Sequence, residues 1–531
     1  MAQPQNNVSL TAPGFAGLNT QDSPLDMNYQ FASVANNCVI DNFGRIASRK
    51  GLQAYTTNPE AFNSNPVESV GELILADGTT YLFVCADSKI FLHDTETTFD
   101  ATALTLPAPI TGNNWQIVSF NDKAYFVQSG HPPLVFDPAV AEDSVQLMAY
   151  PSGAPQWPNA AHAAFGRLWL AAFDDNSTAV WWSGLLDGEQ WDGGGSGAIQ
   201  TSEYWPSGFD QVTTIAAHND FLVIFGQRNI LLYTTTADVA STLSLSDTIE
   251  GIGCLSRDSV VGTGIDFMFV DATGVRSLNR TIQEKSVPLG DISRNVRQEF
   301  QLAIRVEENP DDIKAVFHVE DSFYACFLPT NPKTYVLDTW NPLQGGAARV
   351  TVWTNLTIRC GIRLNNRTTF FGGTGGLYQY QQASDIRLDT DKANAPIETS
   401  IPMEYYTHPL DFGSPSNLIF PKQVDVTLFG GYAGDLTINW GYDYRTPDKS
   451  KTLPLKSTSL PAFWSQEMPP GSEWGDNGVI SYWTQGGTIN QLRYNIWGSG
   501  RNVKVGFYTE ILGSTVSIQE LNIQVLQGRI L

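Results

Sequence analysis

A short apolar meander recurs along most of this chain, and it constrains the fold more than any other feature. Its clearest copy is Val212–Thr236, in which three apolar runs are separated by two polar turns. Three short runs joined by tight turns predict an antiparallel meander of three strands. The middle run, Phe221–Phe225, is so apolar that both of its faces must be buried. A single meander cannot bury two faces, so it needs a similar sheet on either side.

The chain supplies such neighbours from about residue 66 to residue 384. Each copy has a tight turn followed by an apolar run, and successive turns are 44 to 55 residues apart. The turns are Asp77-Gly78, Asn121-Asp122, Gly166-Arg167, Asn219-Asp220, Gly264-Ile265-Asp266, Glu320-Asp321 and Asn365-Asn366. A period of about 40–50 residues with several strands per copy is typical of a β-propeller. Seven copies predict six or seven blades, because one copy can be split to close the ring.

The flanking segments lack this period, and they complete an all-β prediction of four parts. Residues 1–55 are expected to form an extended N-terminal arm with a hairpin, whose strands Asn36–Asp41 and Arg45–Ser48 join at a turn starting at Asp41. Residues 56–384 form the propeller, and 385–394 a polar linker without strand character. Residues 395–531 form a C-terminal β-sandwich or platform domain, because Val424–Leu428 and Leu521–Val525 alternate as strands with one wet face do.

Two insertions interrupt the predicted strand pattern. Asp291–Ile304 places Val296, Phe300 and Ile304 at helical spacing, which predicts a short amphipathic helix with Asp291 or Ser293 as its N-cap. Pro454–Asn477 is rich in Pro, Ser, Trp and Gly, and it predicts a long loop or a tip of the C-terminal domain.

The composition suits a rigid and acidic body. Hydrophobic residues make up 42% of the chain, so disorder is not expected, and the formal net charge is −23. A basic nucleic-acid footprint is therefore absent. The acidity serves either solubility or a surface that must not retain a polyanion. The sequence contains no apolar run long enough to span a membrane, and no signal peptide is visible. Its five cysteines are widely spaced, which predicts buried free thiols. We therefore expect the chain to fold in a cytoplasm.

Motifs for nucleotide, zinc and calcium binding are missing, and we expect no catalytic site, no cofactor and no metal. One alternative is a propeller glycosidase, because carboxylates lie near tryptophans in one insertion. Its candidates are Asp174, Asp175, Asp187, Glu189, Trp181, Trp182 and Trp191. The competing interpretation is that these acids cap turns and the tryptophans wedge between blades.

Two charged clusters are candidate interaction sites. Arg45, Arg49 and Lys50 form a basic cluster in an otherwise acidic chain, and they either dock on an acidic partner ring or face solvent at a strand end. The acidic loop after the predicted helix carries Glu307, Glu308, Asp311 and Asp312, which are candidates for facing a channel lumen.

The arm also carries a resemblance to a known family. Pro13–Leu52 resembles the opening of tail nozzle proteins (tail tubular protein B, or hub-like) of short-tailed bacteriophages. The shared pattern is a Gly-rich lead-in, a Gln-Asp-Ser-Pro turn, an Asn-Cys apolar strand, and a hairpin ending in Arg-Lys-Gly. The later segment Pro409–Gly413 fits the same architecture, so the resemblance spans most of the chain. Related hub and stabilisation proteins share these motifs.

The resemblance implies a structural virion protein without enzymatic activity. Such a protein forms a homohexameric ring that continues the DNA-ejection channel below the portal and adaptor rings. Its implied partners are copies of itself, the adaptor or portal-proximal ring, tail fibre or needle proteins, and viral DNA that passes without tight binding. Its implied location is the virion tail, after assembly in the host cytoplasm. A receptor-binding tail protein is a further alternative to the glycosidase.

Overall fold

The computed structural model describes most of the chain. The described residues are 5–24, 26–56, 59–93, 102–150, 153–206, 208–236, 238–264, 266–284, 291–380, 385–389, 395–413, 415–430, 434–455, 489–512 and 515–528. Strands dominate these residues, as the repeat predicted.

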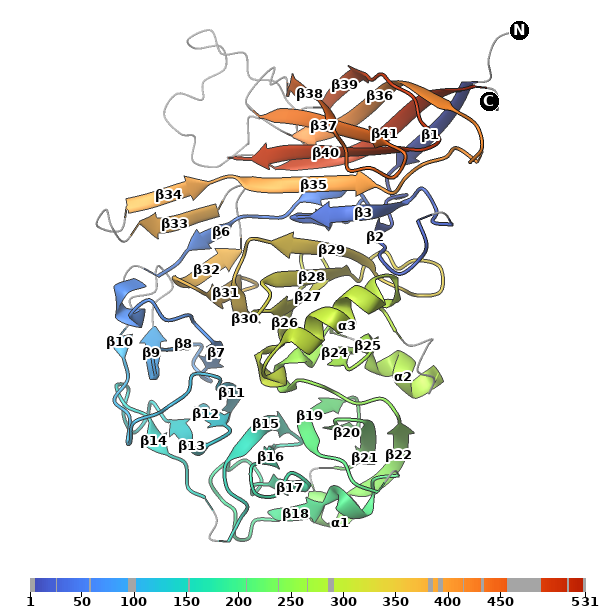
Figure 1. The fold of residues 1–531 in the computed structure, drawn as a ribbon. Helices are drawn as coiled ribbons and strands as arrows, with labels where there is room; N and C mark the ends of the chain where they lie inside the picture. The colour runs from blue at the N-terminus through green and yellow to red at the C-terminus, as the bar shows by residue number, and fades with distance from the viewer. Residues whose placement is uncertain are drawn as a thin grey trace.

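The repeat region folds into short antiparallel sheets that follow one another in chain order (Figure 1). The first two sheets contain β7 (Ser69–Ile74), β8 (Thr80–Ala86), β9 (Lys89–His93) and β10 (Thr102–Ala103), then β11 (Gln116–Phe120), β12 (Lys123–Gln128), β13 (His131–Phe136) and β14 (Gln146–Leu147). The next two contain β15 (Pro158–Ala164), β16 (Arg167–Phe173), β17 (Ala179–Trp182) and β18 (Gly197–Gln200), then β19 (Val212–His218), β20 (Phe221–Gly226), β21 (Asn229–Thr234) and β22 (Ser244–Glu250).

The last three sheets of the repeat differ from the first four in the strand, if any, that follows their first three strands. One has the described strands β23 (Val261–Gly262), β24 (Phe267–Asp271) and β25 (Gly274–Ser277). The following sheet begins with β26 (Lys314–His318), β27 (Phe323–Leu328), β28 (Lys333–Asp338) and β29 (Arg349–Thr354). The last contains β30 (Ile358–Arg363), β31 (Thr369–Gly373) and β32 (Gly376–Tyr380), and its next strand is β6 (Leu52–Ala54) from near the start of the chain.

The first strands of most neighbouring sheets pack against one another, the sheets of β20 and β24 share an apolar core, and β30 contacts β7, so the series closes on itself. This ring of meanders is the arrangement of a β-propeller. Every predicted tight turn whose residues are described lies between the first two strands of its sheet, for example Asn219-Asp220 between β19 and β20. The turn at Gly264–Asp266 includes residue 265, which lies outside the described residues.

The middle strands explain why the repeat must close into a ring. Along β20, Leu222 and Ile224 pack with the preceding sheet, whereas Val223 and Phe225 pack with the following one. Consecutive side chains of a strand point to opposite faces, so an apolar middle strand joins two neighbours at once. Each fully buried large side chain contributes about 1.5–3 kcal/mol. The prediction of two buried faces is confirmed.

Short helices fill the connections. They are η1 (Pro59–Phe62), η2 (Thr201–Glu203), η3 (Arg257–Ser259), η4 (Arg294–Val296), η5 (Pro310–Asp312), α1 (Val239–Thr242), α2 (Leu278–Glu284) and α3 (Arg297–Val306). The predicted amphipathic helix is α3, with Phe300 and Ile304 buried. It begins later than predicted, and Asp291 is not its N-cap: this carboxylate instead accepts hydrogen bonds from Ser293 and lies 3.0 Å from Arg297 Nε.

Two larger sheets form the rest of the molecule. The ten-stranded sheet extends the β26–β29 sheet by β2 (Gly17–Leu18), β3 (Phe31–Asn36), β35 (Ile401–Thr407), β40 (Val503–Ile511), β37 (Asp435–Tyr442) and β38 (Lys449–Pro454). The six-stranded sheet contains β39 (Ile489–Asn495), β36 (Ile419–Gly430), β41 (Val516–Gln527), β5 (Ile46–Ser48) and β4 (Cys38–Ile40), with β1 (Gln5–Thr11) also paired to β41. Val424–Leu428 and Leu521–Val525 alternate between buried and partly exposed, as predicted.

The N-terminal segment is not an extended arm, and this part of the prediction is wrong. The predicted hairpin is present as β4 and β5, but β1 pairs with β41 along its whole length, and β3 pairs with β35. In Figure 1, β3 and β35 lie between the propeller and the remaining C-terminal strands. Gly17 packs so closely on β29 that a Cβ atom would lie 2.6 Å from the Val350 carbonyl oxygen, which only glycine avoids at its φ of 78°.

The predicted linker also differs. Asp385–Asp389 forms strand β33, which pairs with β34 (Ala395–Thr399) and runs parallel to β6. Residues 390–394 lie outside the described residues. Strand β33 lies between β6 and β34 in this sheet, and only Ile386 and Leu388 alternate with its charged residues, which is too short a signal to set the strand apart from its polar surroundings. The predicted loop Pro454–Asn477 also lies outside the described residues, except for its first two positions.

Candidate functional site

The basic cluster predicted at the hairpin does not form an exposed patch. Arg49 is 2% exposed, and its guanidinium donates to the carbonyl of Lys50. Arg45 pairs with Asp41 at 2.7 Å and lies over the rings of Phe43 and Phe429. Lys50 pairs with Asp321 of the propeller at 2.7 Å. Arg49 therefore cannot dock on a partner from this position, because apolar packing and internal hydrogen bonds enclose it, and the other two cations already have internal partners.

The acidic loop is also divided by the fold. Glu307 is buried and accepts a hydrogen bond from the Thr330 amide, whereas Glu308 is exposed. Asp311 lies in η5 and accepts a hydrogen bond of 2.8 Å from Asn159, which is on the inner strand β15. Burial raises the pKa of Asp312, with Lys314 and Arg359 opposing this effect. Asp311 and Asp312 thus lie near the centre of the propeller, and the nearby charge of Glu308 helps to raise the pKa of Asp312, whereas Glu307 is buried against Thr330.

The carboxylates near the tryptophans are engaged in turns and ion pairs. Asp174 accepts hydrogen bonds of 2.7 Å from the Ser129 hydroxyl and from the Gly130 amide. Asp175 accepts a hydrogen bond from the backbone amide of Gln156, and Asp187 accepts one from the backbone amide of Glu189. Glu189 forms an ion pair with Lys123 at 2.7 Å. Trp182 and Trp191 belong to apolar cores within and between sheets. These contacts fit turn-capping acids and core tryptophans rather than a sugar site.

A cluster of buried charged residues lies at the centre of the ring. Arg257, in η3 before β23, is 1% exposed. Its guanidinium reaches across the ring to two other sheets, donating 2.7 Å hydrogen bonds to the carbonyl and side-chain oxygens of Asn159. It also donates to the carbonyl and side-chain oxygens of Asn114, just before β11, at 3.1 and 3.0 Å. Its neighbour Asp258 accepts the remaining hydrogen bonds, at 3.0 and 2.7 Å.

A second cation extends this cluster to the first sheet. Lys314, at the start of β26, donates to the carbonyl of Glu68 at 2.7 Å and to the Ser69 hydroxyl at 3.1 Å. It lies 3.5 Å from the Asp258 carboxylate, and Arg359 of β30 lies 3.6 Å from Glu68. We name Arg257, Asp258, Lys314, Glu68, Arg359, Asn114 and Asn159 the axial network. It joins residues from six sheets or the segments that lead into them.

The pKa shifts within the axial network agree with buried charges that are paired. Burial alone would raise the pKa of Asp258, but Arg257 and Lys314 outweigh it and hold this pKa below its ordinary value. Burial raises the pKa of Glu68, and the charges of Arg359 and Lys314 oppose that shift only in part. The centre of the cluster is therefore an ionised Asp258 between two cations, as expected for a buried charge that is paired.

A cavity of about 230 Å³ adjoins the axial network, lined in part by Trp115, Arg257 and Lys314. Every N–H group of Arg257 that points into the cluster already has an oxygen partner, and Lys314 has three. Because their N–H donors are already hydrogen-bonded within the protein, Arg257 and Lys314 hold the sheets together and have no donor left for a substrate. The network therefore bridges the centre of the ring and obstructs passage along the propeller's own axis.

Sequence reasoning did not find the axial network. Glu68, Lys314 and Arg257 each lie at the start of an inner strand or in the few residues before it, in different copies of the repeat. That position was the available signal, because charged residues there point toward the ring centre in several copies at once.

Within the described ranges, there is no group of three or more His, Cys, Asp or Glu side chains that could hold a metal ion. The described part of the chain also contains no helix with the length and apolarity needed to cross a membrane.

Comparisons with known proteins give only distant similarities. No family model matches the chain, and no curated protein matches it in sequence. Similar solved structures include a streptogramin B lyase, with 11% identity, a TM-score of 0.36, and coverage of 60% of this chain and 93% of that chain. The WD40 domain of Neurospora crassa Pan2 has 10% identity, a TM-score of 0.38, and coverage of 63% and 98%. The WD40 β-propeller domain of Doa1 has 8% identity, a TM-score of 0.37, and coverage of 59% and 96%. Similarities this weak carry no inference about activity.

Proposed function

We propose that this protein is a structural subunit of a phage tail nozzle, without enzymatic activity. In this proposal, copies of the chain assemble into a ring, with six subunits expected, below the portal and adaptor rings of a short-tailed virion. The ring continues the channel through which DNA leaves the particle, and fibre or needle proteins attach to it. The resemblance of Pro13–Leu52 and Pro409–Gly413 to nozzle proteins motivates this assignment.

The observation that carries the proposal is the continuous ten-stranded sheet between the propeller and the second domain. Strands β29, β2, β3 and β35 are hydrogen-bonded neighbours, so the two parts are joined by backbone ladders rather than by a linker. Backbone ladders resist shear better than a flexible connection does, because many hydrogen bonds must break together. A stiff body of this kind suits a wall element that must withstand the passage of DNA.

The finer architecture belongs to the same proposal. We infer seven blades, with β6 serving as the outer strand that closes the last blade after β32. We also infer that the six-stranded sheet and the outer half of the ten-stranded sheet form a β-sandwich, since side chains of both enter one apolar core. The two ends of the chain both contribute strands to this sandwich.

The axial network supports a channel that lies between copies of the chain. Arg257 and Lys314 bridge the centre of the propeller, so DNA would pass between copies of the chain and not through any one propeller. The formal charge of −23 suits such a wall, because carboxylates repel phosphates over a Debye length of about 8 Å at physiological salt. DNA would then slide past without being held.

Electron microscopy of the purified full-length protein and of the intact virion tests this proposal. We expect class averages with six-fold rings, and the same rings below the portal of the particle. A duplex DNA band-shift assay at low salt, where electrostatic attraction is strongest, is expected to give no shift. A chain that stays monomeric at all concentrations and is missing from the tail would overturn the proposal, as would tight binding of duplex DNA.

A further inference from the structure

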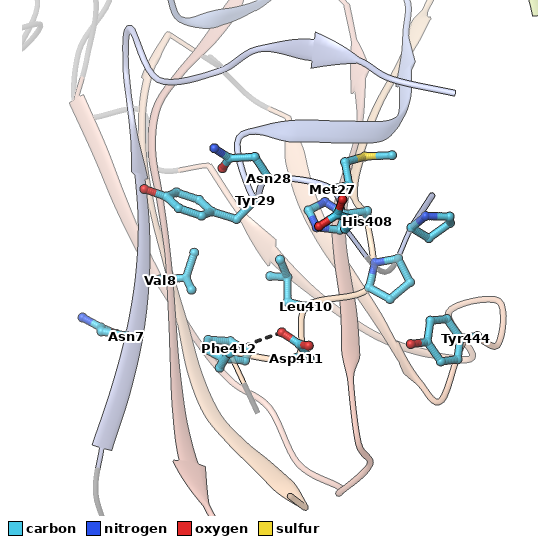
Figure 2. A pocket seen from close by; sticks show the side chains of 14 residues that line it. Asn7, Val8, Met27, Asn28, Tyr29, His408, Leu410, Asp411, Phe412 and Tyr444 are labelled. Carbon is cyan, nitrogen blue, oxygen red and sulfur yellow. Dashed lines mark hydrogen bonds between the residues drawn. The ribbon is translucent and has the colours of Figure 1, made fainter. Parts of the chain in front are cut away.

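A cavity of about 570 Å³ lies where three distant segments of the chain meet in the C-terminal part of the molecule. Its walls come from β1, from Pro24 and residues 26–29, and from residues 408–413, with Tyr444 at the far side (Figure 2). The size falls in the range of about 300–1,000 Å³ typical of ligand pockets. Two of these segments are those that resemble nozzle proteins, but the proposed ring channel gives the cavity no role.

The walls of the cavity are held in place by the surrounding sheets. Leu410 exchanges backbone hydrogen bonds of 2.9 and 3.0 Å with Val503 of β40. The carbonyl of Phe412 accepts a hydrogen bond from the Gln527 side chain of β41 at 3.2 Å, and a ring nitrogen of His408 lies 3.4 Å from the Phe31 carbonyl. A ligand would therefore meet a largely preformed site and lose little free energy to ordering it.

The floor of the cavity is apolar. Figure 2 shows Val8, Leu410 and Phe412 around one space, with Tyr29 along the same side as Val8. Phe412 has a φ of 54°, which is uncommon for a bulky residue and costs about 1–3 kcal/mol. This strained conformation keeps a half-buried aromatic ring at the cavity, and strained backbone of this kind clusters at binding sites.

The rim of the cavity is acidic. Asp26 and Asp411 both line it, and in the part of the chain that the structure describes neither carboxylate has a Lys, Arg or His within ion-pair distance. His408 also lines the cavity, but burial lowers the pKa of its imidazole, so this ring is neutral at neutral pH. The two negative charges beside an apolar floor are thus left for a ligand to neutralise.

We propose that this cavity binds a peptide segment of another protein, one in which a Lys or Arg adjoins a large aliphatic side chain. The aliphatic group fills the space between Val8, Leu410 and Phe412, while the cation pairs with Asp26 and Asp411. A neutral sugar fits less well: Tyr29, Phe412 and Tyr444 offer it aromatic faces, but it would leave the negative charges of Asp26 and Asp411 without a cation. An anionic ligand is disfavoured by both carboxylates.

Fluorescence anisotropy with the full-length protein tests this proposal. The probes are three labelled hexapeptides, Gly-Arg-Leu-Leu-Arg-Gly, Gly-Glu-Leu-Leu-Glu-Gly and Gly-Arg-Gly-Gly-Arg-Gly. We expect the first to bind at least about tenfold more tightly than either of the others, because each of them lacks one of the two interactions. Equal affinities for the first and third peptides would overturn the role of the floor, and no binding of the first would overturn the proposal.

Two double variants separate the cavity from general surface charge. The pair Asp26→Asn and Asp411→Asn is expected to weaken binding of the first peptide at least about fivefold, while the asparagine at 411 can still accept from the Gly413 amide. The matched control is Asp220→Asn with Glu308→Gln, which removes two exposed charges of the propeller and should leave the affinity unchanged. An equal loss in both double variants would show attraction to net charge alone and reject the site. Displacement of the peptide by a neutral gluco-oligosaccharide would also reject it, in favour of a sugar site.

Discussion

The propeller and the C-terminal sheets are stabilised in different ways. In the propeller, the strands β7 to β32 follow one another in chain order within each sheet, with β6 added to the last one, and side chains join neighbouring sheets. In the C-terminal sheets, neighbouring strands come from opposite ends of the chain, as when β1 and β5 pair with β41. The propeller therefore depends on side-chain complementarity between local units, and the C-terminal part depends on backbone pairing over the longest separations in the chain.

This difference shows where each region is vulnerable. The centre of the propeller contains charged groups, whose removal leaves buried partners unpaired. The C-terminal part contains a large apolar core, to which N-terminal residues such as Phe15 and Leu18 contribute. Truncation of a buried N-terminal side chain should therefore destabilise the C-terminal sheets.

The largest expected effect is that of Phe15→Ala. Phe15 is fully buried and packs edge-on against Tyr405 of β35 at 5.8 Å between ring centroids. Truncation of a buried phenylalanine costs about 3–5 kcal/mol of unfolding free energy, measurable by urea denaturation. The control is Phe43→Ala, which lies in the same segment but is 72% exposed and should change stability by less than about 1 kcal/mol. Similar losses of stability in both variants would mean that Phe15 is not packed in the core, as expected if residues 1–55 formed the extended arm that the sequence predicted.

A somewhat smaller effect is expected for Arg257→Ala in the axial network. The variant leaves Asp258 and the carbonyls of Asn114 and Asn159 without their shared donor. We expect a loss of about 3 kcal/mol, at the low end for breaking a buried pair, because Lys314 still lies 3.5 Å from Asp258. Tryptophan fluorescence during urea unfolding measures it, and Arg228→Ala, which removes an exposed guanidinium, is the control. No difference between the two variants would mean that the network does not join the sheets.

A pH-dependent effect is expected at the junction of the two regions. Burial raises the pKa of Asp338, opposite Arg349 in the ten-stranded sheet, from 3.8 to about 6. Because the folded state binds this proton more tightly than the unfolded state does, its stabilising contribution is present below about pH 4 and is lost as the pH rises through 6. Asp338→Asn should therefore gain stability relative to the wild type between pH 4 and 7, by up to about 3 kcal/mol. Chemical denaturation across this range measures the difference, and a parallel pH dependence in both proteins would contradict the shift. The exposed Asp220→Asn variant is the control.

The smallest effect is expected for Lys50→Met, which removes a contact between the N-terminal segment and the propeller. The pair of Lys50 with Asp321 is partly exposed, so solvent screens it and the expected loss is about 0.2–1 kcal/mol. The loss should shrink further at high salt. Thermal unfolding at low and high salt measures both effects. A loss as large as that of Arg257→Ala would mean that exposed ion pairs, and not buried groups, hold the two regions together.

Much of the propeller could be predicted from local sequence. The apolar run Phe221–Phe225 and the turn Asn219-Asp220 specify a hairpin by themselves, because alternation and turn chemistry act over a few residues. The burial of all five cysteines likewise followed from their apolar surroundings. The candidate sites were less predictable: the cluster of Arg45, Arg49 and Lys50 is contiguous in sequence, yet the fold gives each cation a different internal partner.

What the sequence alone determined is therefore the unit of structure: short strands, tight turns and a period that must close into a ring. Only the tertiary structure decided which distant strands pair, as β6 does with β32 and β1 with β41. It also decided that Arg257 and Lys314 both pair with Asp258, and that Pro24 and Asp411 line one cavity. The physical reason is that strand pairing and charge pairing over hundreds of residues depend on which surfaces remain available once the local units have formed, and no local pattern records that choice.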